Sequence, residues 1–253
     1  MKKPSEAATP LIGCAGWNIP KEAAASFPEA GSHLERYAAV FPMVEINSSF
    51  YKPHRPATYA RWAESVPDDF KFAVKVPRAI THDAQMRDID ELLARFAGEV
   101  GELKHKLGCL LVQTPPKLGF HDGTARDFFL KLEESFGCMI ACEGRHPSWF
   151  SDIATKVLRE RKVTRVIADP AAGQPGPHVP TTNDMYVRLH GAPRIYYSSY
   201  SPEYLDALVR DLAVHSAAGR QVWCIFDNTA AGEAVPNALD VLRALRDGVL
   251  PPA

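Results

Sequence analysis

Eight short apolar runs alternate along this chain with segments whose apolar residues recur every three or four positions. Short apolar runs are typical of buried strands, and the longer spacing is typical of helices that bury one face. Strands that alternate with helices favour parallel pairing through right-handed crossovers. The predicted strands are Leu11–Ala15, Met43–Asn47, Phe70–Val76, Cys109–Gln113, Cys138–Glu143, Thr164–Asp169, Met185–His190 and Gln221–Asp227.

Helical spacing fills most of the gaps between these runs. The predicted helices cover residues 34–41, 59–66, 89–107, 122–134, 153–158, 205–212 and 238–245. Ser151 or Asp152 is a suitable cap for the fifth of them, and Gly219 is a typical stop for the sixth. Four prolines and two glycines lie between Asp169 and His190. They interrupt any helix there, so the sixth crossover is expected to be irregular.

The number and spacing of the units indicate the architecture. Eight units in 253 residues take about 32 residues each, which is near the spacing of a (β/α)8 barrel. The sequence therefore predicts an α/β fold, a single TIM-like barrel over residues 11–253, after a disordered tail at residues 1–10. A doubly wound open sheet is the alternative, although Gly13–Trp17 does not match the G-x-G-x-x-G motif that such sheets often carry.

Charge and cysteine content exclude several classes of protein. The chain has 29 Lys and Arg against 30 Asp and Glu, a net charge of −1, which disfavours a nucleic-acid or membrane-surface protein that relies on a basic surface. No stretch approaches ~18 uninterrupted apolar residues, so no membrane span is predicted. The five cysteines form no C-x-x-C pair. They are expected to be free thiols, and with no signal-peptide pattern at the start we expect a cytoplasmic protein.

Polar side chains end seven of the eight predicted strands. In a barrel, the carboxyl ends of the strands and the loops that follow them surround the active site. The candidates there are Glu45, Asn47, Lys75, Gln113, Glu143, Arg145, His146, Asp169, Arg188, His190, Asp227 and Asn228. Because side chains alternate along a strand, Arg188 and His190 share a face. Strand ends also meet water by default, so turn caps and structural ion pairs are the alternative for each residue.

These residue types suit acid–base chemistry on an anionic substrate. Carboxylates can act as general bases and imidazoles exchange protons near neutral pH. The candidate catalytic residues are Glu45, Glu143, His146, Asp169 and His190. Three cations can bind a phosphate or carboxylate, namely Lys75, Arg145 and Arg188. An imine at Lys75 is conceivable, since a desolvated lysine loses its charge, but no second sequence feature supports it.

A divalent metal at the strand ends is a second hypothesis, because Glu, Asp and His are common ligands. The chain has neither H-x-H nor H-E-x-x-H, and Arg145 beside Glu143 disfavours a cation. No metal and no cofactor is therefore predicted. The alternative is a metal-dependent hydrolase or isomerase that uses Glu45, Glu143, Asp169 and His190. A non-catalytic ligand-binding protein is the third hypothesis.

Several motifs occur in a distinctive order along most of the chain. They are Ile12–Trp17 (IGCAGW), Val44–Tyr51 (VEINSSFY), Lys75–His82 (KVPRAITH), Glu143–Trp149 (EGRHPSW) and Tyr186–Gly191 (YVRLHG). Together they resemble the YecE-like family, also called domain of unknown function 72. The second and third motifs are the specific ones, and the likeness runs from about Leu11 to Leu245.

The resemblance implies a TIM-barrel fold and no established activity. It implies site positions at Asn47, Lys75, His82, Gln113, Glu143, Arg145, His146, Asp169, Arg188, His190 and Asn228, which adds His82 to the residues at the strand ends. The chain departs from the family pattern at Cys14, Gly144 and Asp227. Gly144 opens the space beside Glu143, and Asp227 adds a negative charge.

The leading hypothesis is thus a metal-independent enzyme that acts on a small phosphorylated or carboxylated molecule. The residues expected to bind it are Asn47, Lys75, His82, Gln113, Arg145, Arg188 and Asn228. The small anion is the only partner that the sequence suggests, and the oligomeric state stays open.

Overall fold

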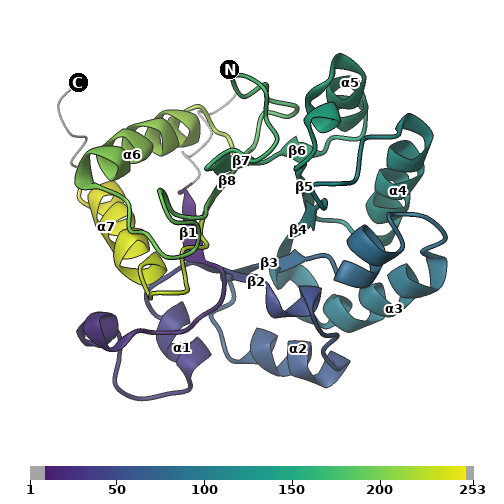
Figure 1. Ribbon diagram of the computed structural model, residues 1–253. Coiled ribbons are helices and arrows are strands. Elements are labelled where there is room, and N and C mark those ends of the chain that lie inside the picture. Colours follow the sequence, from purple (N-terminus) through teal and green to yellow (C-terminus); the bar gives the residue numbers. More distant parts are fainter. Residues whose placement is uncertain (1–8, 249–253) are drawn as a thin grey trace, which may run out of the picture.

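The computed structural model describes residues 9–248, and in it parallel strands line the centre while helices lie outside them (Figure 1). The strands are β1 (Leu11–Cys14), β2 (Met43–Ile46), β3 (Lys71–Lys75), β4 (Leu107–Gln113), β5 (Met139–Glu143), β6 (Thr164–Arg165), β7 (Ile167–Asp169), β8 (Met185–Leu189) and β9 (Val222–Phe226). They form a four-stranded sheet in the order β1-β9-β8-β7 and a five-stranded sheet in the order β2-β3-β4-β5-β6. All of these pairs are parallel, as the alternation of strands and helices predicts.

Each of the eight predicted strands contains an observed strand, and the sixth is divided in two. β6 pairs with β5, whereas β7 pairs with β8. Val166 lies between them and donates its N–H to the Cys142 carbonyl at 3.0 Å. The chain therefore passes from one sheet to the other inside this single apolar run.

We call this change of sheet between β6 and β7 the first seam. A second seam, where strand pairing is again interrupted, lies between β1 and β2. β1 pairs with β9 along its whole length, and only Ala15, just beyond its end, forms a bridge with Glu45. The Gly16 N–H donates to the Glu45 carbonyl at 2.9 Å beside that bridge. The structure confirms an α/β fold with parallel strands. It does not confirm one closed eight-stranded sheet, because hydrogen bonding is interrupted at both seams.

The helices occupy the predicted gaps. They are α1 (His33–Ala38), α2 (Pro56–Glu64), α3 (Asp90–Val100), α4 (Asp122–Ser135), α5 (Asp152–Glu160), α6 (Pro202–Ala217) and α7 (Ala234–Arg246). Short helical turns are η1 (Lys21–Ser26), η2 (Ser48–Phe50), η3 (Ala79–Asp83), η4 (Gly101–Lys106) and η5 (Pro147–Phe150). Within residues 9–248, no helix combines the length and the apolar character needed to cross a membrane.

Local sequence signals explain several of these boundaries. The Ser151 hydroxyl accepts the Ala154 N–H at 3.2 Å and so caps α5, as predicted. Gly219 follows α6 with φ of 72°, a left-handed conformation that glycine adopts without steric cost. Residues 170–184 connect β7 to β8 without a helix, which confirms the irregular sixth crossover. The predicted tail falls mostly on residues 1–8, outside the described residues, and the single domain over 11–253 stays a prediction.

Apolar side chains form two layers. The outer layer lies between the strands and the helices and includes the rings of Tyr37, Phe72 and Phe128. The inner cluster fills the space that the strands surround, and its buried members are Met43, Ala73, Cys109, Leu111, Ala141, Val166, Tyr186, Trp223 and Ile225. Polar residues follow two positions later on several of the same strands. Because side chains alternate along a strand, these polar side chains form a layer directly above the inner cluster, which we call the polar layer.

Gly13 lets β1 approach β2 at the second seam. A Cβ atom at this position would lie 2.3 Å from the Met43 carbonyl oxygen and 2.4 Å from the Met43 sulfur. One of these contacts is to backbone, which cannot be moved by a change of side-chain rotamer. The close approach of the two sheets therefore depends on the absence of a side chain here.

We predict that Gly13→Ala lowers the free energy of unfolding by about 1–3 kcal/mol, the usual cost of overpacking a tight interior. Urea unfolding monitored by circular dichroism measures it. Gly98→Ala is the matched control, because Gly98 lies inside α3 with no atom within 4 Å of an added Cβ. It should stabilise by up to about 1 kcal/mol through helix propensity. Equal midpoints for the two variants would contradict the tight packing at Gly13.

Candidate functional site

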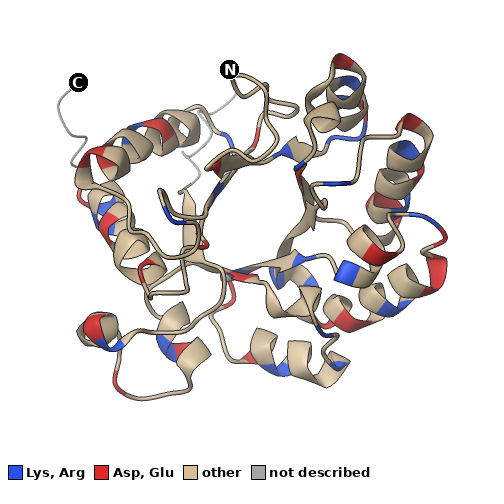
Figure 2. Cartoon of the chain, viewed as in Figure 1, with Lys and Arg blue, Asp and Glu red and all other residues tan. Residues whose placement is uncertain are grey.

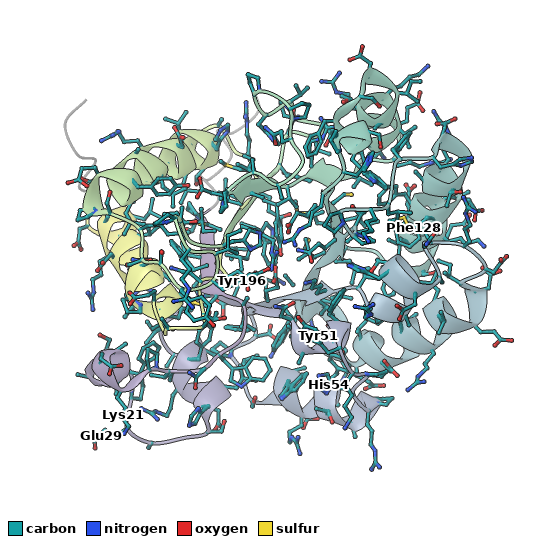
Figure 3. The ribbon with its side chains drawn as sticks, in the orientation of Figure 1. Lys21, Glu29, Tyr51, His54, Phe128 and Tyr196 are labelled. Carbon is teal, nitrogen blue, oxygen red and sulfur yellow. The ribbon has the colours of Figure 1, made fainter. Side chains whose placement is uncertain are left out.

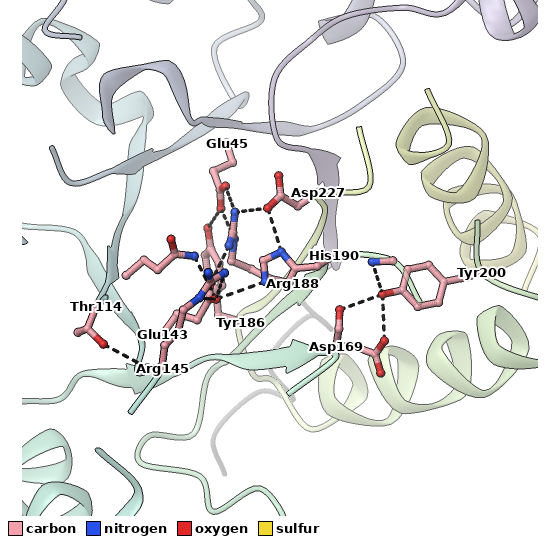
Figure 4. Close-up of polar contacts among 12 residues, drawn as sticks. Glu45, Thr114, Glu143, Arg145, Asp169, Tyr186, Arg188, His190, Tyr200 and Asp227 are labelled. Carbon is pink, nitrogen blue, oxygen red and sulfur yellow. Dashed lines mark hydrogen bonds and ion pairs between the residues drawn. The ribbon is translucent and has the colours of Figure 1, made fainter. Parts of the chain in front are cut away.

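Arg188 on β8 lies at the centre of a group of buried charges (Figure 4). Its side chain is completely buried. The guanidinium donates to both carboxylate oxygens of Glu45, at 3.0 and 2.7 Å. It also donates to Glu143 at 2.7 Å and to Asp227 at 2.9 Å. We call Glu45, Glu143, Arg188, His190 and Asp227 the central cluster.

His190 lies between two of these carboxylates. Its Nδ1 is 3.0 Å from Asp227 Oδ2, and its Nε2 is 3.3 Å from Glu143 Oε1. Nε2 is buried and makes no hydrogen bond with the described residues. Burial disfavours the imidazolium, but the hydrogen bond to Asp227 and the proximity of Glu143 outweigh it and raise the pKa of His190. The ring can therefore carry a proton near neutral pH.

Asp227 and Glu143 are held in the ionised form. Burial alone would raise the pKa of each carboxyl, but the adjacent Arg188 guanidinium outweighs this effect, and His190 adds to it. The pKa of both carboxyls is lowered as a result. Both ionised carboxylates therefore stabilise the imidazolium form of His190.

Strand register brings two further predicted residues to Glu143. Gln113 on β4 is paired with Glu143 on β5, and its amide donates to Glu143 Oε1 at 3.0 Å. The Arg145 side chain turns back along its own strand end and donates through Nε to the same oxygen at 2.9 Å. One fifth of the Arg145 side chain is exposed, so this guanidinium borders the solvent.

Lys75 ends β3 on the face that carries Ala73 of the inner cluster. The residue is 5% exposed. Its ammonium lies 4.2 Å from the centre of the Phe50 ring and makes no hydrogen bond or ion pair with residues 9–248 that would compensate its burial. Burial first, and then Arg188, lower the pKa of Lys75 to about 8.

The remaining predicted residues lie around the central cluster and make other contacts. Asp169 accepts a hydrogen bond from the Tyr200 hydroxyl at 3.0 Å, and His146 is bonded to Ser148 at 2.8 Å, where it caps η5. These contacts agree with the structural alternative for both residues. Neither side chain is bonded to the central cluster.

Two asparagines and His82 complete the predicted set. Asn228 donates to Ser198 and Asn237, while its Oδ1 is buried without a partner among the described residues. Asn47 Oδ1 is also buried and unpartnered in the described part of the chain. His82 is bonded to its neighbour Thr81 at 2.9 Å. Burial, together with the nearby cations, lowers the pKa of His82 to about 4.

Asp227, a strand-end candidate from the sequence, directly follows β9, two positions after Ile225 of the inner cluster. Two residues that were not among the predicted site residues, Tyr186 and Tyr196, also contribute to this region. The Tyr186 hydroxyl donates to Glu45 Oε2 at 2.9 Å, and it precedes Arg188 by two positions on β8. Tyr196 packs edge-on against His190 with ring centres 5.8 Å apart and has φ of 70°. No sequence signal predicts its contact with His190.

The surroundings of the cluster differ from the rest of the molecule. Most charged residues lie on the outer helices (Figure 2), whereas these lie on the inner face of the strands. Tyr51 and Tyr196 lie near the middle of the view in Figure 3, far from Lys21 and Glu29 at the edge. Both tyrosines are exposed. Among residues 9–248, no group of three or more His, Cys, Asp or Glu has an arrangement that could hold a metal ion.

We predict that Asp227→Asn lowers the pKa of His190, because the variant removes the carboxylate that accepts from its ring. NMR titration of the imidazole Cε1–H resonances measures this value. Asp169→Asn is the matched control, since its carboxylate binds Tyr200 and not His190. A His190 pKa that is unchanged in Asp227→Asn would show that this contact does not hold the proton.

We also predict that Arg188→Met lowers the free energy of unfolding by about 3–5 kcal/mol at pH 7, because it leaves buried carboxylates uncompensated. The pKa of Glu143 and Asp227 rises without the guanidinium. When the pH is lowered from 7 to 5, these carboxylates become protonated and repel each other less. The stability difference between the variant and the wild type is therefore smaller at pH 5. Urea unfolding at both pH values measures it. Arg126→Met is the control, because it breaks only exposed ion pairs. It should lower the free energy of unfolding much less at both pH values. A deficit that is equal at pH 7 and pH 5 would argue against this account.

Comparisons with known proteins agree with this architecture. A family model described as protein of unknown function DUF72 matches residues 11–252. The UPF0759 protein YecE of Escherichia coli K12 is 32% identical over 164 residues, which span 62% of this chain and 58% of that protein. The UPF0759 protein YunF of Bacillus subtilis 168 is 23% identical over 92% of this chain and 94% of its own length.

Solved structures show the same arrangement of strands and helices. The crystal structure of a DUF72 family protein (TM1631) from Thermotoga maritima MSB8 matches with a TM-score of 0.78 and 26% identity, covering 94% of this chain and 99% of that one. A DUF72 family protein (EF0366) from Enterococcus faecalis V583 matches with a TM-score of 0.78 and 22% identity, over 92% and 94% of the two chains. The chain belongs to the DUF72 family, whose members are described as proteins of unknown function.

Proposed function

We propose that this protein is an enzyme that moves protons on a small phosphorylated or carboxylated molecule, without a metal, at the carboxyl ends of its strands. In this proposal the two sheets act together as the wall of one TIM-like barrel. The substrate lies against the polar layer, on the side away from the inner cluster. Tyr196 borders the same place, because its ring packs against His190.

The charge balance of the region supports an anionic substrate. Three cations oppose three carboxylates, namely Lys75, Arg145, Arg188, Glu45, Glu143 and Asp227. Protonated His190 adds one positive charge to this balanced set. Arg188 has its donors engaged by carboxylates, so the positive charge open to a ligand is that of Lys75, Arg145 and His190. This distribution assigns Arg188 a positioning role in place of the substrate-binding one that the sequence suggested.

The arrangement of His190 supports proton transfer, and it is the observation on which the proposal depends. Asp227 fixes Nδ1, which leaves the buried Nε2 directed toward Glu143 without a hydrogen bond. An imidazole that is oriented on one side and unsatisfied on the other is suited to donate or accept a proton. In this proposal Nε2 exchanges the proton with the substrate, and Glu143 stabilises the imidazolium.

The two alternatives receive less support from the contacts. A metal site needs Glu45, Glu143, Asp169 and His190 to converge. Glu45 and Glu143 instead accept from Arg188, and Asp169 accepts from Tyr200. A non-catalytic binding protein has no need of a buried imidazole whose Nε2 faces a carboxylate at 3.3 Å without a hydrogen bond, because an unsatisfied buried nitrogen costs free energy.

Incubation of the purified protein with a bacterial metabolite extract, followed by mass spectrometry, tests the proposal. We expect depletion of a phosphorylated or carboxylated compound, and a rate lower by about 10²-fold or more in His190→Gln, the usual contribution of a general acid or base. His105→Gln is the matched control, because His105 is exposed and paired with Asp68. It should act like the wild type.

Each other outcome of this assay contradicts a defined part of the proposal. A compound that binds and is recovered unchanged favours the non-catalytic alternative. Depletion that stops in a chelator and returns with a divalent cation favours the metal-dependent alternative. Depletion of an uncharged compound contradicts the anionic substrate, and equal rates in His190→Gln and the wild type contradict the role of His190.

A further inference from the structure

Two lysines of this chain, Lys75 and Lys106, are buried, and they differ in whether their ammonium has hydrogen-bond acceptors. Lys106 is 8% exposed, and its ammonium donates to the carbonyls of Ala63 at 2.7 Å and Val66 at 2.8 Å. Lys75 is 5% exposed and has no such acceptor among residues 9–248. A buried ammonium without acceptors is costly, so the environment of Lys75 favours the neutral amine.

The charges around Lys75 come from several elements. Burial of the group opposes the ammonium, as does Arg188 on β8. Glu45 on β2, Glu143 on β5 and Asp227, directly after β9, favour it. The balance lowers the pKa of Lys75 to about 8. At pH 7 about one amine in ten is then neutral, against fewer than about one in a thousand for an ordinary lysine. His82 in η3 also lies within electrostatic reach.

The contacts of Lys75 keep its nitrogen available. The Phe50 ring lies 4.2 Å from Nζ, measured to the ring centre, and this cation–π contact attracts the ammonium without engaging the nitrogen in a hydrogen bond. The position of Lys75 at the carboxyl end of β3 directs the side chain to the polar layer. An unpaired, partly neutral amine in a low-dielectric place is the arrangement that activates lysine as a nucleophile.

We propose that Lys75 is a nucleophile that forms an imine with the carbonyl carbon of an anionic aldehyde or ketone. This inference rests on the proposed function and names its substrate class. It adds covalent chemistry to the acid–base chemistry of His190.

The step is balanced without an oxidant or reductant. The lone pair of Nζ attacks the carbonyl carbon, and the π electrons move to the oxygen, which takes a proton. The nitrogen then loses a proton, the C–O bond breaks, and the oxygen leaves as water with a second proton. Protonated His190 is suited to give the first proton to the oxygen. The neutral ring then takes the proton that the nitrogen loses and returns it to the departing oxygen, while Glu143 stabilises the imidazolium form.

Reductive trapping tests the imine in the wild-type protein. The protein is incubated at pH 7 with glyceraldehyde 3-phosphate and sodium cyanoborohydride, and each lysine adduct is quantified by peptide mass spectrometry. We expect Lys75 to be labelled at least about tenfold faster than Lys71, which begins the same strand and donates to the His105 carbonyl at 2.9 Å. Labelling of Lys75 should reach half of its maximal rate near pH 8.

Further arms separate this inference from the function on which it rests. Uncharged glyceraldehyde should label Lys75 more slowly than its phosphate does. Equal rates would keep the imine and contradict the anionic substrate. Lys75 labelled no faster than Lys71 would overturn the imine, even where the extract assay is positive. Lys75→Met should abolish the adduct at this peptide, whereas Lys71→Met should leave it in place.

Discussion

The buried guanidinium of Arg188 must be matched by negative charge, and this requirement links strands that are distant in the sequence. A cation removed from water is tolerated only where acceptors surround it. Those acceptors are Glu45 on β2, Glu143 on β5 and Asp227, which directly follows β9. The contacts cross the interior between the two sheets, β8 and β9 being in one and β2 and β5 in the other. They therefore hold together two sheets whose own hydrogen bonding is interrupted.

Much of the fold was predictable because it depends on local patterns. Apolar runs and helical spacing located all eight strand regions, and the prolines before Met185 indicated the irregular crossover. The split of the sixth strand was not predictable, because it depends on which sheet each half joins. The contact between β1 and β2 likewise depends on the close approach of Gly13 to Met43, which no pattern along one strand reveals.

The candidate site was predictable as a set of strand ends and not as a set of contacts. Alternation grouped Arg188 with His190, and register brought Gln113 to Glu143. The partners of a side chain depend on strands that meet only in the fold, so the sequence could not show that Arg188 is bonded to Glu45, Glu143 and Asp227. Lys75 is the opposite case. It is of chemical interest because no described residue accepts a hydrogen bond from its ammonium. Only the burial and the distances in the folded structure show this.

The inner cluster beneath the polar layer limits the side from which a small molecule can approach the polar residues. Tyr186, Trp223 and the other members of the inner cluster fill the space between the strands below Arg188. In the proposed function, a substrate that reaches Lys75 and His190 from the carboxyl ends of the strands also has to leave on that side. Substrate binding and product release then exclude each other, and Tyr196, which packs against His190, influences both.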